Sequence, residues 1–283
     1  MAVRSLLLVL KRRVLPILLL LAGFPSAASA TWSIVAVNRQ TGEVVIASAT
    51  CVPGAALSRL HPLGLRGVQA IVVPGKGGAV AQAAVDTSWQ NQTFIYGELQ
   101  KGTPPAEIIA ALVKQDTRMA SRQFAIVDVD GRSAGHSGSD NGEFSLDVQG
   151  VVEGTPIVFS VQGNILADAS VVHEAVKALR GSEGALTDRV MAAMEAADRN
   201  GGDRRCSCDR GPKVDAPCDA RTAHVAYILQ ADAGDKPGTS YNDGQYAMFI
   251  GVTDQDVQPN ENANPVKTLR LRYDAWKAKA ARR

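Results

Sequence analysis

Residues 28–37 read ASATWSIVAV, and this stretch decides how the rest of the sequence is interpreted. Its first three residues have the small-x-small pattern of a signal-peptidase site. The remainder is a continuous run of apolar and small residues, which is typical of a strand covered on both faces. No spacer separates the two. If cleavage falls after Ala30, the mature chain begins with Thr31, inside the first strand.

The segment before this stretch has the composition of a secretory leader. Residues 1–30 hold a basic region, a short apolar run from Val14 to Gly23, and then small residues. A membrane-spanning helix needs about 20 apolar residues, more than this run provides. We therefore expect a signal peptide over residues 1–30, export to the periplasm or the extracellular space, and no stable membrane span after cleavage.

Removal of the leader changes the charge balance. Residues 1–30 contain 4 of the 30 basic residues and none of the 28 acidic ones, so residues 31–283 carry a formal charge of −2. A nearly neutral chain gives no electrostatic reason to expect nucleic acid as a partner. The remaining length fits one large domain over residues 31–283. Neither length nor charge sets an oligomeric state.

Strand pairs and helix pairs follow one another along the chain. Strands are expected at 32–37, 43–50, 68–73, 79–85, 123–129, 132–137, 155–162, 223–230 and 246–253. Helices are expected at 89–99, from Thr103, after a capping Asp168, from Thr187 to about 200, and in a basic segment at 266–281. Residues 53–64 look irregular. This order predicts an α+β fold with two stacked sheets between two helical layers.

A threonine at a mature N-terminus has unusual chemistry. Its α-amine has an ordinary pKa of about 7.7–8.0, against about 10.4 for lysine, so roughly a tenth of it is neutral at pH 7. Thr31 could thus act as a nucleophile that carries its own base. Donors for the oxyanion are also needed. We expect them among Gln82 and Asn164, with Ser33 and Ser48 as further polar positions; each is equally explained as a buried, hydrogen-bonded residue.

The four cysteines are Cys51, Cys206, Cys208 and Cys218, and the last three fall in a polar loop at 205–222. In an exported chain they indicate disulfides. A bond between Cys206 and Cys208 would be strained, so Cys218 is expected to pair with one of them. The member of the Cys206/Cys208 pair that Cys218 does not bond then forms a disulfide with Cys51 or stays free. The alternative is zinc held by Cys206, Cys208 and Cys218 with a fourth ligand. No motif predicts a cofactor.

Several segments occur together in the order found in one known family. They read TWSIVA at 31–36, VAQA at 80–83, QFAIVD at 123–128, SVQGNILA at 160–167 and NGGDRR at 200–205. On these segments the chain resembles, over nearly all of residues 31–283, the bacterial and archaeal family catalogued as domain of unknown function 1028. The resemblance implies a four-layer αββα sandwich like that of N-terminal-nucleophile hydrolases, with Thr31 exposed at the terminus.

Two features depart from that pattern. The cysteine-bearing insert after Arg205 is absent from simpler members of the family. No lysine lies between Thr31 and Lys76, so Arg59 or Arg66 would have to supply the positive charge that proteasome-like relatives take from a lysine.

The leading hypothesis is an exported amidohydrolase that cleaves a small-molecule or peptide amide through an acyl-ester on Thr31. One alternative is a non-catalytic ligand- or protein-binding module with the same fold. Another is a zinc- or disulfide-stabilised interaction domain.

Overall fold

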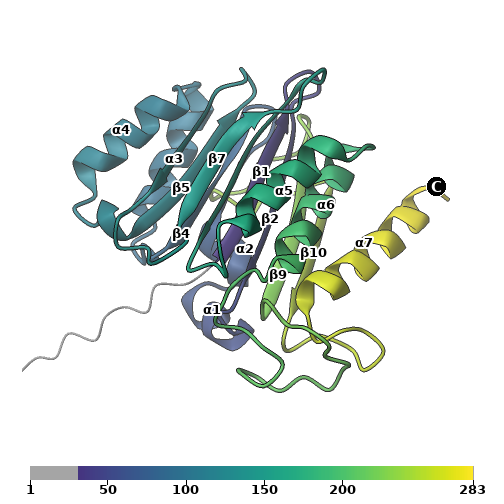
Figure 1. Ribbon diagram of the computed structural model, residues 1–283. Coiled ribbons are helices and arrows are strands. Elements are labelled where there is room, and N and C mark those ends of the chain that lie inside the picture. The colour runs from purple at the N-terminus through teal and green to yellow at the C-terminus, as the bar shows by residue number, and fades with distance from the viewer. Residues whose placement is uncertain (1–30, 283) are drawn as a thin grey trace, which may run out of the picture.

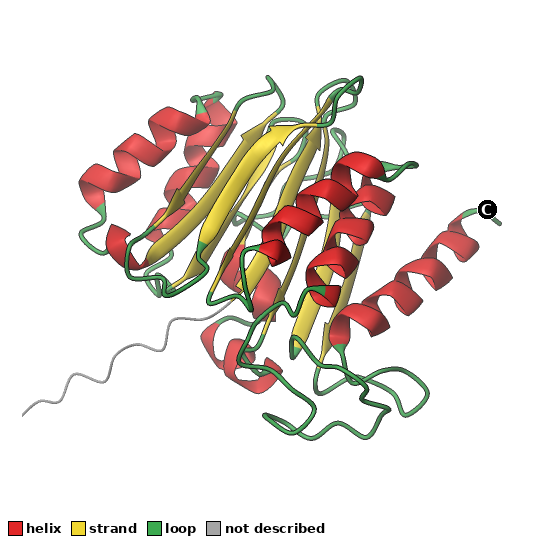
Figure 2. Cartoon of the chain, in the orientation of Figure 1, coloured by secondary structure: helices red, strands yellow, loops and turns green. Residues whose placement is uncertain are grey.

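The structure is a computed structural model that describes residues 31–282. Two antiparallel sheets pack face to face, and helices cover both outer faces (Figure 2). The six-stranded sheet consists, in spatial order, of β10 (Met248–Thr253), β9 (Val225–Ala231), β2 (Glu43–Thr50), β1 (Thr31–Asn38), β8 (Ile157–Asn164) and β7 (Leu146–Val151). The four-stranded sheet consists of β3 (Ala70–Val73), β4 (Gly77–Ala83), β5 (Arg122–Asp128) and β6 (Ser133–Ser137).

The helices form two outer layers (Figure 1). On the four-stranded sheet lie α3 (Gln90–Lys101) and α4 (Pro105–Gln115), followed by a short 3-10 turn at Met119–Ser121. On the six-stranded sheet lie α5 (Ser170–Gly181), α6 (Leu186–Arg199) and α7 (Pro265–Ala280). Two short helices, α1 (Gly54–Leu60) and α2 (Gly64–Gln69), connect β2 to β3. The predicted α+β sandwich of two sheets between two helical layers is confirmed.

Three apolar layers hold the sandwich together. Trp32 and Phe159 pack against α5, α6 and α7 on the outer face of the six-stranded sheet. Val35 and Ile46 meet the four-stranded sheet in the middle layer. Because successive residues of a strand point to opposite faces, β1 contributes to two of these layers at once. This explains why its sequence is continuously apolar or small rather than alternating.

Two elements differ from the sequence-based expectation. Residues 53–64, expected to be irregular, contain α1, and α2 takes the first two residues of the strand expected at 68–73. Both helices are too short to show a helical repeat, and their sequence is interrupted by Pro62 and Gly64. The sequence pattern does not predict strand β7, because this edge strand is only half-buried and lacks an apolar run.

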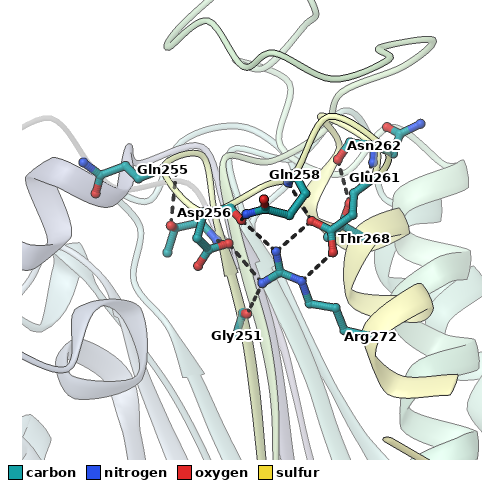
Figure 3. Close-up of polar contacts among 9 residues, drawn as sticks. Gly251, Gln255, Asp256, Gln258, Glu261, Asn262, Thr268 and Arg272 are labelled. Atoms are coloured by element: carbon teal, nitrogen blue, oxygen red, sulfur yellow. Dashed lines mark hydrogen bonds and ion pairs between the residues drawn. The ribbon is translucent and has the colours of Figure 1, made fainter. Parts of the chain in front are cut away.

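The C-terminal helix is fastened to the sheet by Arg272 (Figure 3). Its guanidinium group donates two bonds of 2.8 Å to the carboxylate of Glu261. It also donates to the Asp256 side chain at 3.0 Å and to the Gly251 carbonyl at 3.0 Å. One side chain on α7 thereby ties β10 and the loop that follows it to the helix. Among the described residues, no helix combines the length and apolar composition needed to cross a membrane.

Candidate active site

Thr31 is the first residue of β1, at the end of the central strand. In the sheet register it lies opposite Thr50 of β2 and opposite Asn164 of β8. Residues directly opposite one another on antiparallel strands share a face, with Cβ atoms about 5 Å apart. The three side chains therefore form one row across the sheet. All are buried, with Thr31 only 2% exposed.

The hydroxyl of Thr31 is oriented by Thr50. Thr31 Oγ1 donates to Thr50 Oγ1 at 3.1 Å. Thr50 Oγ1 also accepts from the backbone N–H of Val52 at 3.2 Å, which fixes its position just after β2 ends. Two hydroxyl groups are thus held side by side at the edge of the middle layer.

Gln82 of β4 connects Thr31 to the opposite sheet. Its Nε2 donates to the Thr31 carbonyl at 3.1 Å and to Gln123 Oε1 at 2.7 Å. Its Oε1 accepts from Ser33 Oγ at 2.7 Å. A carboxamide nitrogen has two hydrogens, and both are engaged. In this geometry Gln82 fixes the backbone of Thr31.

The other polar positions predicted from sequence support the same strand. Ser48 Oγ donates to the carbonyl of Trp32 at 2.8 Å. Gln123, which sequence reasoning did not single out, donates from Nε2 to the carbonyl of Gly163 at 2.9 Å. Its local sequence is that of an ordinary buried strand, so no signal marked it as a bridge between the sheets.

A narrow cavity opens beside Thr31, and its accessible volume of about 10 Å³ is room for about one water molecule. Its polar wall consists of Thr31, Thr50, Gln69 and Gln82. The remaining walls are aliphatic and come from the segment after β2, from α1 and α2, and from β4 and its end: Val52, Leu57, Leu65, Val68, Ala81, Ala83 and Val85. Mostly apolar walls with a few convergent polar groups are characteristic of small-molecule sites, but those sites enclose about 300–1,000 Å³, far more than this cavity. No charged side chain lines this cavity.

A much larger open depression, with an accessible volume of about 380 Å³, lies near Asp86, Asn91 and Asp116. Its carboxylates are already engaged: Asp86 accepts from Ser88 and from the Asn91 backbone, and Asp116 accepts from Asn91 and Arg122. These bonds hold the pKa of both aspartates below its ordinary value against the opposing effect of burial. Size alone does not make it the better site, because no activated nucleophile lies there.

Segments that are far apart in the sequence meet beside the row of Thr31. The N–H of Ala167 donates to the carbonyl of Gly202 at 2.9 Å, which joins SVQGNILA to NGGDRR. The fully buried Asp203 accepts from the backbone N–H of Cys51 at 3.0 Å and pairs with Arg205 at 2.8 Å. At Gly202, with φ of +48°, an added Cβ would lie 2.6 Å from the Trp32 ring, so this position requires glycine.

The cysteines form two pairs, Cys51 with Cys206 and Cys208 with Cys218. This confirms that Cys218 bonds one member of the Cys206/Cys208 pair, and it assigns the other to Cys51. The three cysteines considered as zinc ligands are therefore divided between two disulfides. His224 lies beside Cys51 and Cys206, with the ligand atoms of all three within 4.8 Å of one another. Burial, with Arg221 and Arg205 nearby, lowers the pKa of His224 to about 4.

Neither arginine considered as a substitute for a catalytic lysine lines the cavity. Arg59 is exposed at the end of α1. Arg66 lies over the ring of Phe249, 4.3 Å from its centroid, beside Tyr227 in a separate depression. Burial lowers the pKa of its guanidinium.

Comparison with known proteins identifies the family. The model of DUF1028, a family of unknown function, matches residues 31–215, and the chain belongs to this family. The crystal structure of a DUF1028 protein from Silicibacter pomeroyi is similar, with a TM-score of 0.62. It is 23% identical, and the match covers 87% of this chain and 86% of that one. At this identity the likeness concerns the fold alone. No curated protein matches the chain.

Proposed function

We propose that this protein is an exported hydrolase that uses Thr31 as an N-terminal nucleophile to cleave an amide. One observation carries the proposal: the residue after the expected cleavage site begins the central strand and lines an apolar cavity. Chain termini usually fray before the first element of structure. A terminus fixed within a sheet beside a cavity is the arrangement that a reactive α-amine requires. The family resemblance implies a fold like that of N-terminal-nucleophile hydrolases, and the two sheets between helical layers agree with that expectation.

The chemistry follows from cleavage after Ala30, which lies outside the described residues together with the rest of the proposed signal peptide. The neutral α-amine of Thr31 accepts the proton of its own hydroxyl as Oγ1 attacks the amide carbonyl. The amine then passes that proton to the leaving nitrogen as the C–N bond breaks, which leaves an acyl-ester on Thr31. A water molecule, deprotonated by the same amine, releases the acid and restores the hydroxyl.

Neighbouring residues take distinct roles in this proposal. Thr50 orients the hydroxyl, and Gln82 with Ser33 fixes the backbone of Thr31. Asn164, directly opposite Thr31 in the register, is proposed as the oxyanion donor. Ser48 supports the strand from the other side. No cofactor is part of the mechanism, and residues 31–283 are proposed to act as a single domain.

The test begins with the mature terminus. Intact-mass and N-terminal sequencing of the exported protein should give Thr31 as the first residue. Purified protein is then screened against chromogenic acyl amides. Hydrolysis should disappear in Thr31→Ala and persist, reduced, in Thr31→Ser, while the exposed Thr41→Ala behaves as wild type. A mature terminus at any other residue would refute the mechanism.

The second candidate is a binding module without chemistry, and the cavity lined by no charged side chain is the observation that favours it. It predicts a ligand whose affinity is unchanged in Thr31→Ala. It also predicts no acyl-protein adduct by mass spectrometry after mixing with activated esters or amides, whereas the hydrolase predicts an adduct on Thr31.

A further inference from the structure

Cys51, Cys206 and His224 lie together just after the end of β2. One ligand atom from each side chain, two sulfurs and a ring nitrogen, lies within 4.8 Å of the other two. Cys51 and His224 are buried, whereas Cys206 is half-buried at the protein surface. The two cysteines form a disulfide in this structure. Two cysteine sulfurs and one imidazole are also a known set of protein ligands for zinc.

Hydrogen bonds hold the backbone of these three residues together independently of the disulfide. The N–H of Cys51 donates to the Asp203 carboxylate at 3.0 Å, and the N–H of Cys206 donates to the Asp203 carbonyl at 3.2 Å. The N–H of His224 donates to the carbonyl of Thr50 at 2.7 Å. The three side chains therefore remain neighbours when the bond between the sulfur atoms is broken.

The imidazole of His224 is positioned by the cysteine-bearing loop. Its Nε2 packs against Gly211, where an added Cβ would overlap the ring. Its Nδ1 is buried and has no hydrogen-bond partner among residues 31–282. Gln162 is unpartnered in the same way outside any cluster, so this property alone assigns no ligand. The His224 ring differs because it lies beside two sulfur atoms, which is the arrangement that a shared metal ion requires.

We propose that Cys51, Cys206 and His224 bind a zinc ion when their disulfide is reduced. A dithiol supplies the two electrons: the S–S bond breaks, two thiols form, and the dithiol becomes a disulfide. Zn²⁺ then displaces the two thiol protons and binds both thiolates and the imidazole lone pair. Tetrahedral zinc ligands lie about 3.5–3.8 Å apart. Because the Cα atoms of the two cysteines are 5.7 Å apart, side-chain rotation is enough to bring the sulfurs to this separation.

The surroundings define what kind of zinc site this is. Within residues 31–282 the cluster offers three ligands, which leaves the fourth tetrahedral position for water or an external ligand. Two thiolates cancel the charge of Zn²⁺, so the ion is compatible with Arg221 and Arg205 near His224. The half-buried Cys206 gives the ion access from solvent. Zinc thus replaces the disulfide as the link between the end of β2 and the cysteine-bearing loop, whether or not Thr31 is catalytic.

The test uses variants of the mature protein that separate this site from the other cysteine pair. Cys208→Ser/Cys218→Ser keeps the proposed ligands, and Cys51→Ser/Cys206→Ser keeps only the second pair. Each protein is reduced with dithiothreitol, freed of it without oxygen, and titrated with Zn²⁺ against a chromogenic chelator. The first variant should bind one zinc ion per chain when reduced and none when oxidised. Absence of zinc from its reduced form, or equal binding by the second variant, would overturn the proposal.

The imidazole ligand is tested at His224 within the Cys208→Ser/Cys218→Ser protein. His224→Gln should weaken zinc binding by the reduced protein at least about tenfold, because it removes one of three ligands. His173→Gln, at an exposed position on α5, is the matched control and should bind zinc as before. Equal zinc affinity of the two histidine variants would overturn the three-ligand site.

Thermal unfolding followed by circular dichroism shows whether the reduced Cys208→Ser/Cys218→Ser protein is folded. Because the metal binds the folded state, zinc should raise its melting temperature when reduced and leave it unchanged when oxidised. A reduced chain that is unfolded, and stays unfolded with zinc, would also overturn the proposal. Cobalt in place of zinc should give the near-ultraviolet absorption of a thiolate-to-metal charge transfer, and its absence would exclude thiolate ligands.

Discussion

Gln82 donates a hydrogen bond of 3.1 Å to the backbone carbonyl of Thr31, across the interface between the two sheets. The same side chain bonds Ser33 and Gln123, so it completes a buried polar network in the middle of an apolar layer. Such a network stabilises the protein only while each member has its partner.

We expect Gln82→Met to destabilise the protein, because it leaves the buried Ser33 hydroxyl and the Gln123 carboxamide with fewer partners. The loss should be about 2–4 kcal/mol in the free energy of unfolding, measured by urea titration. The exposed Gln100→Met serves as control, with a change within about 0.5 kcal/mol. A Gln82→Met protein as stable as wild type would contradict the assigned network.

The hydroxyl of Thr50 should matter for rate more than for substrate affinity. Thr50→Val keeps the shape of the side chain but removes the acceptor for Thr31 Oγ1. One hydrogen bond is worth about 1 kcal/mol, which corresponds to a five- to tenfold decrease in kcat. Thr50→Ser keeps the hydroxyl and should lose less. The measurement is the steady-state kcat of wild type and both variants on an amide substrate. An unchanged kcat in Thr50→Val would remove Thr50 from the mechanism.

The strands that carry Thr31 and Asn164 could be predicted from the sequence, whereas the short helices that line the cavity could not. Thr31 and Asn164 were identifiable because each stands at the end of a long buried strand, and the order of strands and helices was enough to place the two sheets. Gln69, which ends α2, cannot be found in this way, since the apolar pattern of its segment predicts a strand. Its burial depends on α1 and α2, which are held by Asn242, more than 170 residues along the chain. Contacts at such separation leave no local pattern.

The two disulfides should contribute unequally to stability. Cys51 and Cys206 are 155 residues apart in sequence, whereas Cys208 and Cys218 are 10 apart. In the chain-entropy model, closing the longer loop stabilises by about 5 kcal/mol and the shorter by about 3 kcal/mol. We expect the Cys51→Ser/Cys206→Ser protein to unfold at a lower urea concentration than the Cys208→Ser/Cys218→Ser protein. Equal midpoints would show that the long-range bond does not constrain the unfolded chain.

The attachment of α7 can be tested at Arg272. Replacing it by lysine keeps the charge but removes the planar fork that bonds Glu261 twice and reaches Asp256 and Gly251. We expect Arg272→Lys to cost about 1–3 kcal/mol in the free energy of unfolding. Arg118→Lys, at an exposed position, provides the matched control and should change stability by less than about 0.5 kcal/mol. If both variants unfold alike, the network in Figure 3 contributes nothing measurable.

His224 should make the stability of the protein depend on pH. Burial, then the charges of Arg221 and Arg205, lower its pKa to about 4 in the folded state, against about 6.5 in an unfolded chain. Between these values the unfolded state binds more protons, so the free energy of unfolding rises with pH. The stabilising contribution is complete above pH 6.5 and is lost as the pH falls toward 4. Its size is on the order of 3 kcal/mol.

Urea unfolding of wild type and His224→Gln between pH 4.5 and 7.5 measures this contribution. Glutamine has no titrating group, so the variant should lose much less stability on acidification than wild type does. The exposed His173→Gln on α5 is the control and should follow the wild-type curve. Parallel curves for wild type and His224→Gln would show that His224 takes up its proton equally well in the folded chain, in conflict with its burial beside two arginines.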